Sequence, residues 1–315
     1  MARYILKRAV LLVIIIFFVS LASFFLVHLL PGNPTDTILG PDATPANAAI
    51  VNHQLGLDKP LYQQYFIWIG HVFQGNLGQS YTTHQTTSSI IKESFPIDIE
   101  LIVLSQILAF ALAFPMAMRA SRKPNGLFDQ VANSATFGML ALPPFVIAPV
   151  FVLLFAVHWH VFPGPASYVP LSQNIGTNLH AMLLPAIVLA MGSIVVYFRL
   201  LRNDLIATLQ EDFITMARSK GLTDRRIMWR HALRPSSVSL LASAGVTIGG
   251  LIAGTFVVEL LLQMPGLGYQ LIFSVNQDDY TVVQGITLVV AVAIVLINFF
   301  FDFLFTVVDP RIARD

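Results

Sequence analysis

Long apolar runs with almost no charged residues recur along the chain, and they restrict its fold more than any other feature. Each run is at or above the roughly 20 residues that a helix needs to cross a hydrocarbon core about 30 Å thick. Charged residues make up only 11% of the chain, whereas a soluble domain has about 25%. The runs therefore predict an all-α membrane protein with six transmembrane helices. The predicted spans are residues 9–30, 99–119, 130–157, 181–201, 236–262 and 281–305.

Two of these spans have features that bear on their interpretation. The first covers residues 9–30, which is longer than the apolar segment of a cleaved signal peptide, about 7–15 residues, and no small-residue cleavage site follows it. The third contains Pro143, Pro144 and Pro149, and prolines inside a helix predict a kink or a break. Such breaks persist in a membrane only where neighbouring helices or a cavity satisfy the freed backbone groups.

The distribution of lysine and arginine predicts which side of the membrane each loop occupies. With six spans, both termini and the loops near 120–129 and 202–235 lie on one side. Of the 18 lysines and arginines, only Lys59 and Lys92 fall on the other side. Because cytoplasmic loops carry an excess of cations, we expect both termini in the cytoplasm.

These assignments divide the chain into four predicted parts. Residues 1–30 form an N-terminal transmembrane helix, and residues 31–98 form a long extracytoplasmic loop. Residues 99–305 form a five-helix transmembrane core that includes the cytoplasmic loop 202–235, and residues 306–315 form a cytoplasmic tail. The chain has no cysteine, which excludes disulfides, thiolate catalysis and cysteine metal sites.

The extracytoplasmic loop contains a predicted helix at residues 60–73. Asp58 can cap this helix, Pro60 suits its first turn, and Gly75 ends it. Two interpretations are open: a helix at the headgroup level of the membrane, or a docking surface for an external protein. Its apolar residues at helical spacing are Leu61, Tyr65, Trp68, Ile69 and Val72. The candidates for docking are Tyr65, Trp68 and Leu77.

The cytoplasmic loop predicts a helix, a tight turn and a second helix. The first helix is amphipathic and is expected to continue from the fourth span. Gly221 can adopt the left-handed conformation that ends it, and Thr223 can cap the next helix, with Asp224 in its first turn. Pro235 is expected to end the second helix. The apolar residues of the first helix are Leu205, Leu209, Phe213 and Met216.

We call residues 214–227 of this loop the elbow, and it has two candidate partners. Its lysine and arginine residues can be attracted by anionic lipid headgroups. That attraction needs positive charge, but it does not need the small residues Ala217 and Gly221. A compact elbow with small residues suits a groove on another protein.

The segment TMARSKGLTDRRIMWRHALRPS, residues 215–236, resembles the loop motif of type I ABC importer permeases. In that family a helical elbow fits a cleft in the cytoplasmic ATPase, and the motif reads roughly Glu-Ala-Ala, three residues, Gly, then an apolar residue and a later Pro. Thr215 and Met216 replace the acidic residue and the first alanine. The matching positions are Ala217, Gly221, Ile227 and Pro235.

Further segments resemble the dipeptide and oligopeptide permeases of that family in order and spacing. Two departures, Thr281 in place of the usual Pro and Asp278 in place of a common Arg, fall near the expected outer gate. The matching segments are LLPGNP (29–34), LGLDKPLYQQY (55–65), GNLGQS (75–80), VVELLLQMPGLG (257–268), DDYTVVQG (278–285) and DPRI (309–312).

This resemblance implies the permease subunit of an ATP-driven importer of di- and oligopeptides, with the type I importer fold, in the inner membrane of a prokaryote. It implies a second homologous permease in a heterodimer, two ATPase subunits or domains that bind ATP and Mg, and an extracytoplasmic peptide-binding protein; no nucleic acid is expected. The implied ATPase-coupling residues are Thr215, Met216, Ala217, Lys220, Gly221, Leu222 and Ile227. The implied candidates for an outer gate or interface are Glu259, Pro265, Gly266 and Gly268.

Intramembrane acids and small residues give further expectations. Glu259 belongs to a gate or interface, or it is solvated at the outer surface. Asp302 is expected to be a packing or interfacial acid near the inner end of the sixth span. Pairs of glycines four residues apart within 236–262 predict close packing inside the bundle or against a second permease.

The chain lacks a GxxxxGK[ST] phosphate loop, and its residues offer no nucleophile–base–orienter set. We therefore expect no catalytic, cofactor or metal site in this chain. His158 and His160 have the spacing of metal ligands, but such a pair alone in an interfacial loop is usually not a metal site. The alternatives are a permease of the same family for nickel chelates or glutathione, an ion-coupled secondary transporter with a broken third span, and a membrane enzyme.

Overall fold

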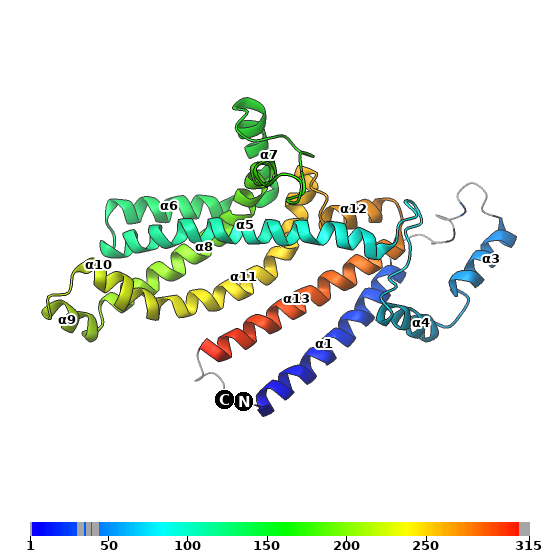
Figure 1. Ribbon diagram of the computed structural model, residues 1–315, viewed down its shortest axis with the longest axis horizontal. Helices are drawn as coiled ribbons and strands as arrows, with labels where there is room; N and C mark the ends of the chain where they lie inside the picture. Colours follow the sequence, from blue (N-terminus) through cyan, green and yellow to red (C-terminus); the bar gives the residue numbers. More distant parts are fainter. Residues whose placement is uncertain (1, 30–34, 36–38, 40–43, 309–315) are drawn as a thin grey trace. The chain divides into compact units, whose positions relative to one another are not determined.

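The computed structural model describes residues 2–29, 35, 39 and 44–308, without the side chains of residues 2–7, 27, 51, 54–55 and 302–308 (Figure 1). The predicted tail after residue 308, most of segment 29–34, the terminal cations and the Asp302 side chain lie outside these limits. The described residues form two compact units. Residues 1–98 and 265–300 belong to the first unit, and residues 99–264 and 301–308 belong to the second unit.

Five helical segments of the described residues are long and apolar enough to cross a membrane, and a bent helix pair gives a sixth span if it counts as one crossing. The prediction of an all-helical membrane protein is thereby confirmed, and the predicted count of six spans is reached only if the bent pair is one crossing. The five segments are α1 (Ala2–Leu29), α5 (Thr87–Arg122), α8 (Ile175–Leu209), the run Asp224–Leu262 and α13 (Tyr280–Val308).

The broken span contains the prolines that predicted it. Helix α6 (Leu127–Ala141) and the pair formed by α7 (Pro144–Phe151) and the π-helix η2 (Val152–His158) are bent by 101°. Leu142 and Pro143 between them are extended, because the helical region is disfavoured for a residue that precedes a proline. Two consecutive prolines therefore end α6 and begin α7 in a new direction.

Helix α5 begins earlier than the sequence predicted. It starts at Thr87, so the predicted loop 31–98 ends before that residue and its last part is helical. The loop also contains a helix that was not predicted, α3 (Pro45–Leu55), which Thr44 caps by accepting a hydrogen bond from the backbone N–H of Asn47 at 3.2 Å. Only the second loop helix, α4 (Leu61–Phe73), matches the prediction.

The prediction that Pro235 ends a helix is wrong. Residues 224–262 form one helical run of α10 (Asp224–Arg226), the π-helix η3 (Ile227–Ala232) and α11 (Leu233–Leu262). The hydroxyls of Ser236 and Ser237 donate to the carbonyl oxygens four residues earlier, at 2.9 Å and 2.6 Å. The π-helix closely precedes this proline, and such a local change of helix geometry lets a helix continue through a proline.

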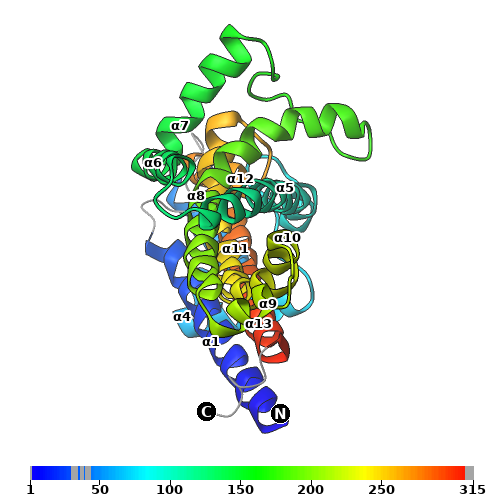
Figure 2. The same ribbon diagram turned by 90° about the vertical axis from the view of Figure 1, so that its left-hand side faces the viewer.

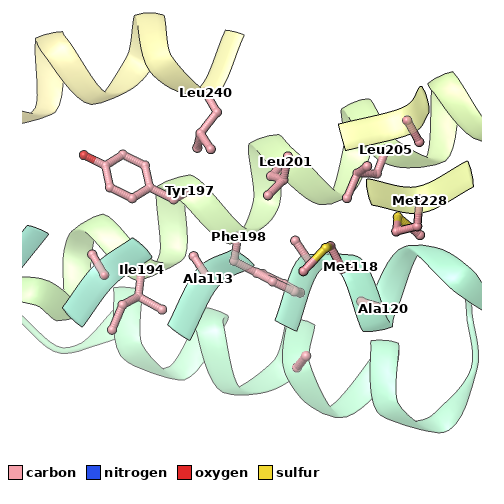
Figure 3. Packing of buried hydrophobic residues seen from close by; sticks show 14 of the residues in the cluster. Ala113, Met118, Ala120, Ile194, Tyr197, Phe198, Leu201, Leu205, Met228 and Leu240 are labelled. Carbon is pink, nitrogen blue, oxygen red and sulfur yellow. The ribbon is translucent and has the colours of Figure 1, made fainter. Parts of the chain in front are cut away.

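A core of buried side chains joins α5, α8 and α11 in the second unit (Figure 3). Ala109, Ala113 and Ala117 recur every four residues on α5 and are fully buried, so one face of α5 is narrow enough for a close approach. Figure 3 shows Phe198 directed from α8 toward α5, and Leu240 directed from α11 toward α8. Small side chains on α5 thus accommodate large ones from α8.

Polar contacts and glycines add to this packing. The Tyr197 ring stacks on Phe110 with centroids 4.7 Å apart, and its hydroxyl donates to Gln106 Oε1 at 2.6 Å. A Cβ added at Gly254 would lie 3.1 Å from Leu189 Cδ1. The predicted close packing of the glycine-rich span inside the bundle is therefore confirmed at Gly254, which allows α11 to approach α8.

A buried ion pair joins α6 to α8. Arg202 donates to both carboxylate oxygens of Asp129 at 2.5 Å, and the Asp129 side chain is only 1% exposed. The same carboxylate accepts from the backbone N–H of Asn125 at 2.8 Å and from Asn133 Nδ2 at 2.9 Å. A buried charge is tolerated only when it is paired and hydrogen-bonded in this way.

Removal of one partner of this pair should destabilise the protein more than removal of both charges. Arg202→Leu leaves a buried carboxylate without its cation, which costs about 3–5 kcal/mol of unfolding free energy. In the double variant Asp129→Asn/Arg202→Leu, most of that loss should disappear, because the asparagine oxygen still accepts from Asn125. Unfolding of the purified protein in detergent measures both values, and equal stability of the two variants would contradict the role assigned to the pair.

Candidate functional site

The elbow has the helix–turn–helix structure that the sequence predicted. Helix α9 (Asp212–Ser219) has Lys220 as its C-cap residue, and Gly221 follows with φ = +77°. The backbone N–H of Leu222 then donates to the Ala217 carbonyl at 3.2 Å. Thr223 caps α10, with its hydroxyl oxygen accepting from the Arg226 N–H at 3.4 Å. Glycine suits this turn because a left-handed backbone is strained for residues with a Cβ.

The elbow is not continuous with the fourth span, contrary to the prediction. Helix α8 ends at Leu209, and Gln210 and Glu211 form a turn before α9 begins. This break rotates α9 relative to the predicted register. Ile214 and Ala217 are consequently the buried residues of α9, whereas Phe213 and Met216, expected on the apolar face, are 45% and 58% exposed.

The seven predicted coupling residues divide between two faces of the elbow. Ala217 and Ile227 are buried in the core cluster, and Leu222 packs against it. They therefore attach the elbow to its own chain. The exposed members are Thr215, Met216, Lys220 and Gly221.

The elbow projects at one end of α8 and α11 (Figure 1), the end that faces the viewer in Figure 2. Side-chain hydrogen bonds connect the two helices that support it. Thr208 Oγ1 and Ser236 Oγ lie 2.9 Å apart, and Ser239 donates to Asp204. The guanidinium of Arg199 on α8 lies 3.9 Å from the ring centroid of Phe137 on α6, which is a cation–π contact.

A second candidate surface, in the first unit, is built on α4. Tyr65 is 6% exposed and packs edge-on against Phe24 of α1 with centroids 5.5 Å apart, while its hydroxyl lies 2.8 Å from Ser20 Oγ. Trp68 also contacts the Phe24 ring, at 5.8 Å. Tyr65 is thus not available as a docking residue. The two aromatic residues attach α4 to α1 instead.

Other predicted residues near α4 have different roles from those expected. Asp58 does not cap the helix; Pro60 occupies the cap position. His53 Nδ1 lies 2.8 Å from Asp58 Oδ2, and this hydrogen bond lowers the pKa of the Asp58 carboxyl. Leu77 is half-buried. The exposed apolar residues of α4 are Leu61, Tyr62, Phe66, Ile67 and Phe73.

The turn after α4 is held against the start of α13 by a buried carboxylate. Asp279 is 1% exposed and accepts from Ser80 Oγ at 2.5 Å and from Thr82 Oγ1 at 3.0 Å. Burial raises the pKa of the adjacent Tyr81 hydroxyl, and the Asp279 charge acts in the same direction. Gly78 has φ = +87°. The GNLGQS segment is thus folded against its own chain through Ser80 and Asp279.

The four candidates for an outer gate do not form one described site. Glu259 belongs to the second unit, and Pro265, Gly266 and Gly268 belong to the first. Glu259 is fully buried near the end of α11, which excludes solvation at the surface of this chain. A gate role for these residues stays a prediction.

Asp98 is an acid that the sequence analysis did not single out. Its carboxylate is 3% exposed and accepts from the backbone N–H of Leu267 at 2.9 Å. Leu267 is the first residue of α12 (Leu267–Asn276), where the helix dipole favours a negative charge. The partners are 169 residues apart in sequence, so no local pattern could reveal the cap.

Within the described residues, no group of three or more His, Asp or Glu could hold a metal ion. His158 ends the π-helix η2, and His160 follows in the loop with φ = +52°. This pair lacks a third ligand in the described part of the chain.

Two family models and several curated proteins match the chain. Residues 109–314 match the model described as binding-protein-dependent transport system inner membrane component, and residues 1–102 match the model of the N-terminal part of such components. The chain is 33% identical over 313 residues to the dipeptide transport system permease protein DppB of Lactococcus lactis subsp. cremoris, covering 99% of each chain. It is 33% identical to a di/tripeptide transport system permease protein of Pseudomonas aeruginosa and 31% identical to the oligopeptide transport system permease protein AppB of Bacillus subtilis, again over 99% of each chain.

Two glycine substitutions test whether the contact of Gly78 with α13 holds the outer turn. Gly75→Ala and Gly78→Ala both place an alanine at positive φ, at a cost of about 1 kcal/mol. A Cβ at Gly78 would lie 2.3 Å from Thr281 Cγ2, whereas no atom lies within 4 Å of a Cβ at Gly75. We expect limited proteolysis to cut segment 75–87 roughly tenfold faster in Gly78→Ala than in Gly75→Ala. Equal cleavage rates would show that the contact is unimportant.

Proposed function

This chain belongs to the binding-protein-dependent transport system inner membrane components, and from that premise we propose that it is a permease subunit of an ATP-driven importer of di- and oligopeptides. The relatives compared are named for dipeptides, di- and tripeptides, and oligopeptides, which favours peptides over nickel chelates or glutathione as cargo. Energy then comes from a partner, and an ion-coupled secondary transporter is not favoured.

The elbow carries the proposed coupling to an ATPase. One face of it is fixed in the core through Ile214, Ala217 and Ile227, which are 0%, 7% and 1% exposed. Its other face exposes the apolar side chains of Phe213 and Met216 beside Lys220. Exposed apolar residues with a polar rim are typical of a protein interface. A partner that moves the elbow would therefore move the ends of two spans with it.

The hydrogen bonds between α8 and α11 support this lever function. Because Thr208 contacts Ser236 and Asp204 contacts Ser239, the two helices are linked at two successive turns near their common end. A force applied at α9 reaches both helices together. The gate that opens when α8 and α11 move is a part of the assembled transporter.

We propose the following assembly around the chain. The elbow lies in the cytoplasm with both termini, as the cation distribution predicts. Two ATPase subunits or domains bind ATP and Mg and contact the elbows of this chain and of a second homologous permease. An external peptide-binding protein docks on the opposite side, where the folded turn at Asp279 and the exposed face of α4 offer a structured surface rather than a flexible tether.

Substitution of Gly221 tests the coupling. No atom of the chain lies within 4 Å of a Cβ at this position, so a larger side chain meets no clash inside the subunit. Gly221→Arg should insert normally but lose most ATPase stimulation and peptide uptake, because its bulk and backbone strain, roughly 1–2 kcal/mol, act at the interface. Both activities are measured with the reconstituted transporter.

A second substitution separates strain from bulk. Asparagine tolerates the left-handed conformation better than other residues with a Cβ, so Gly221→Asn should retain more coupling than Gly221→Arg. A lipid-binding elbow predicts the opposite order, because arginine adds positive charge. If Gly221→Arg assembles and transports normally, the elbow is not the coupling element.

A further inference from the structure

A basic pocket of about 520 Å³ lies beside the elbow in the second unit. Its floor is apolar and includes Ile227 and Met228, which are 1% and 2% exposed. The cations that line it come from two separate parts of the chain. Arg122 and Lys123 follow from the end of α5, outside the elbow, and Arg218 and Arg225 belong to the elbow itself.

Few acidic side chains of this chain neutralise these cations. Asp224 is the acidic residue that lines the pocket, and its contact with Arg218 is long, at 3.8 Å, between side chains that are 88% and 54% exposed. Among the described residues, Arg122, Lys123 and Arg225 form no ion pair. Four cations around one weakly paired carboxylate favour an anionic occupant.

The position of the pocket along α8 decides between a lipid headgroup and a soluble partner. Arg202 is the first residue after the predicted fourth span, residues 181–201. Leu209, which also lines the pocket, lies seven residues further on, or about 10 Å along a helix. The headgroup layer on each side of a bilayer is only about 5–7 Å thick. Measured along α8 from the end of the predicted span, the pocket therefore lies past the thickness of a headgroup layer, within reach of a soluble protein.

We propose that this basic pocket receives an acidic segment of the ATPase subunit, as a contact additional to the one made by the exposed face of the elbow. The inference rests on the proposed function, which supplies the ATPase as partner. Carboxylate side chains of that subunit pair with Arg122, Lys123 and Arg225, and the apolar floor accepts the aliphatic part of the same segment. Charges at an exposed rim chiefly speed association and fix orientation, and salt weakens their effect.

The test compares charge reversals inside and outside the pocket. Arg122→Glu changes a pocket residue that is not part of the elbow, and Arg234→Glu makes the same change at an exposed residue of α11 that does not line the pocket. Each permease variant, assembled with its partner permease in nanodiscs, is titrated with purified ATPase subunit at about 0.1 M and 1 M salt, where the screening lengths are about 10 Å and 3 Å. We expect Arg122→Glu to weaken ATPase binding roughly tenfold at the lower salt and less than about twofold at the higher salt.

Arg234→Glu should change binding by less than about twofold at both salt concentrations. Equal effects of Arg122→Glu and Arg234→Glu, or no effect of either, would overturn the proposal. So would normal ATPase binding by Arg122→Glu together with reduced retention of phosphatidylglycerol by the permease purified in detergent, because the occupant would then be lipid. Lys123→Glu serves as the pocket variant if Arg122→Glu does not insert or unfolds at a lower temperature than the unmodified protein.

The elbow variant separates this inference from the proposed function. If Gly221→Arg loses ATPase binding but both pocket variants keep it, the pocket proposal fails and the coupling role of the elbow stands. If Gly221→Arg and the pocket variants all bind the ATPase normally, and Gly221→Arg also keeps ATPase stimulation and peptide uptake, the proposed coupling role of the elbow fails as well.

Discussion

A backbone in hydrocarbon has no water to bond its N–H and C=O groups, and the architecture of this chain follows from that constraint. Its long apolar segments are helices, in which the interior backbone groups find their partners in the same segment. The constraint also explains the irregular places. Pro143 and Pro144 end one helix and start another, whereas Pro235 lies in a helix that continues, with a π-turn and two serine hydroxyls close by.

Polar side chains then fix how the helices are arranged. Asp129 and Arg202 join α6 to α8 through a bidentate pair, and Asp98 caps α12 although the two are far apart in sequence. Asp279 holds the turn at Ser80 against the start of α13. Each acid is buried and hydrogen-bonded, as a charge in a low-dielectric environment must be. Hydrogen bonds and ion pairs are directional, and so they fix relative helix positions that apolar packing alone leaves adjustable.

The elbow combines a rigid attachment with an exposed surface, and that combination suits a part that transmits force. Its buried residues belong to the same cluster as the side chains of α5, α8 and α11. Its exposed residues and the basic pocket beside it are the parts that a partner can reach. A rearrangement at this end of the molecule therefore acts on the spans through close packing rather than through a flexible loop.

The sequence alone determined the helical membrane class, the broken third span and the left-handed glycine of the elbow, because apolar run length, consecutive prolines and a glycine turn act over a few residues. It did not determine the register of α9, which changes at the turn of Gln210, or the inward direction of Ala217 and Tyr65. It also did not reveal the roles of Asp98, Asp129 and Asp279. Only the tertiary structure decided these points, since a side chain becomes buried or paired through residues that are distant in the chain, and local spacing carries no information about them.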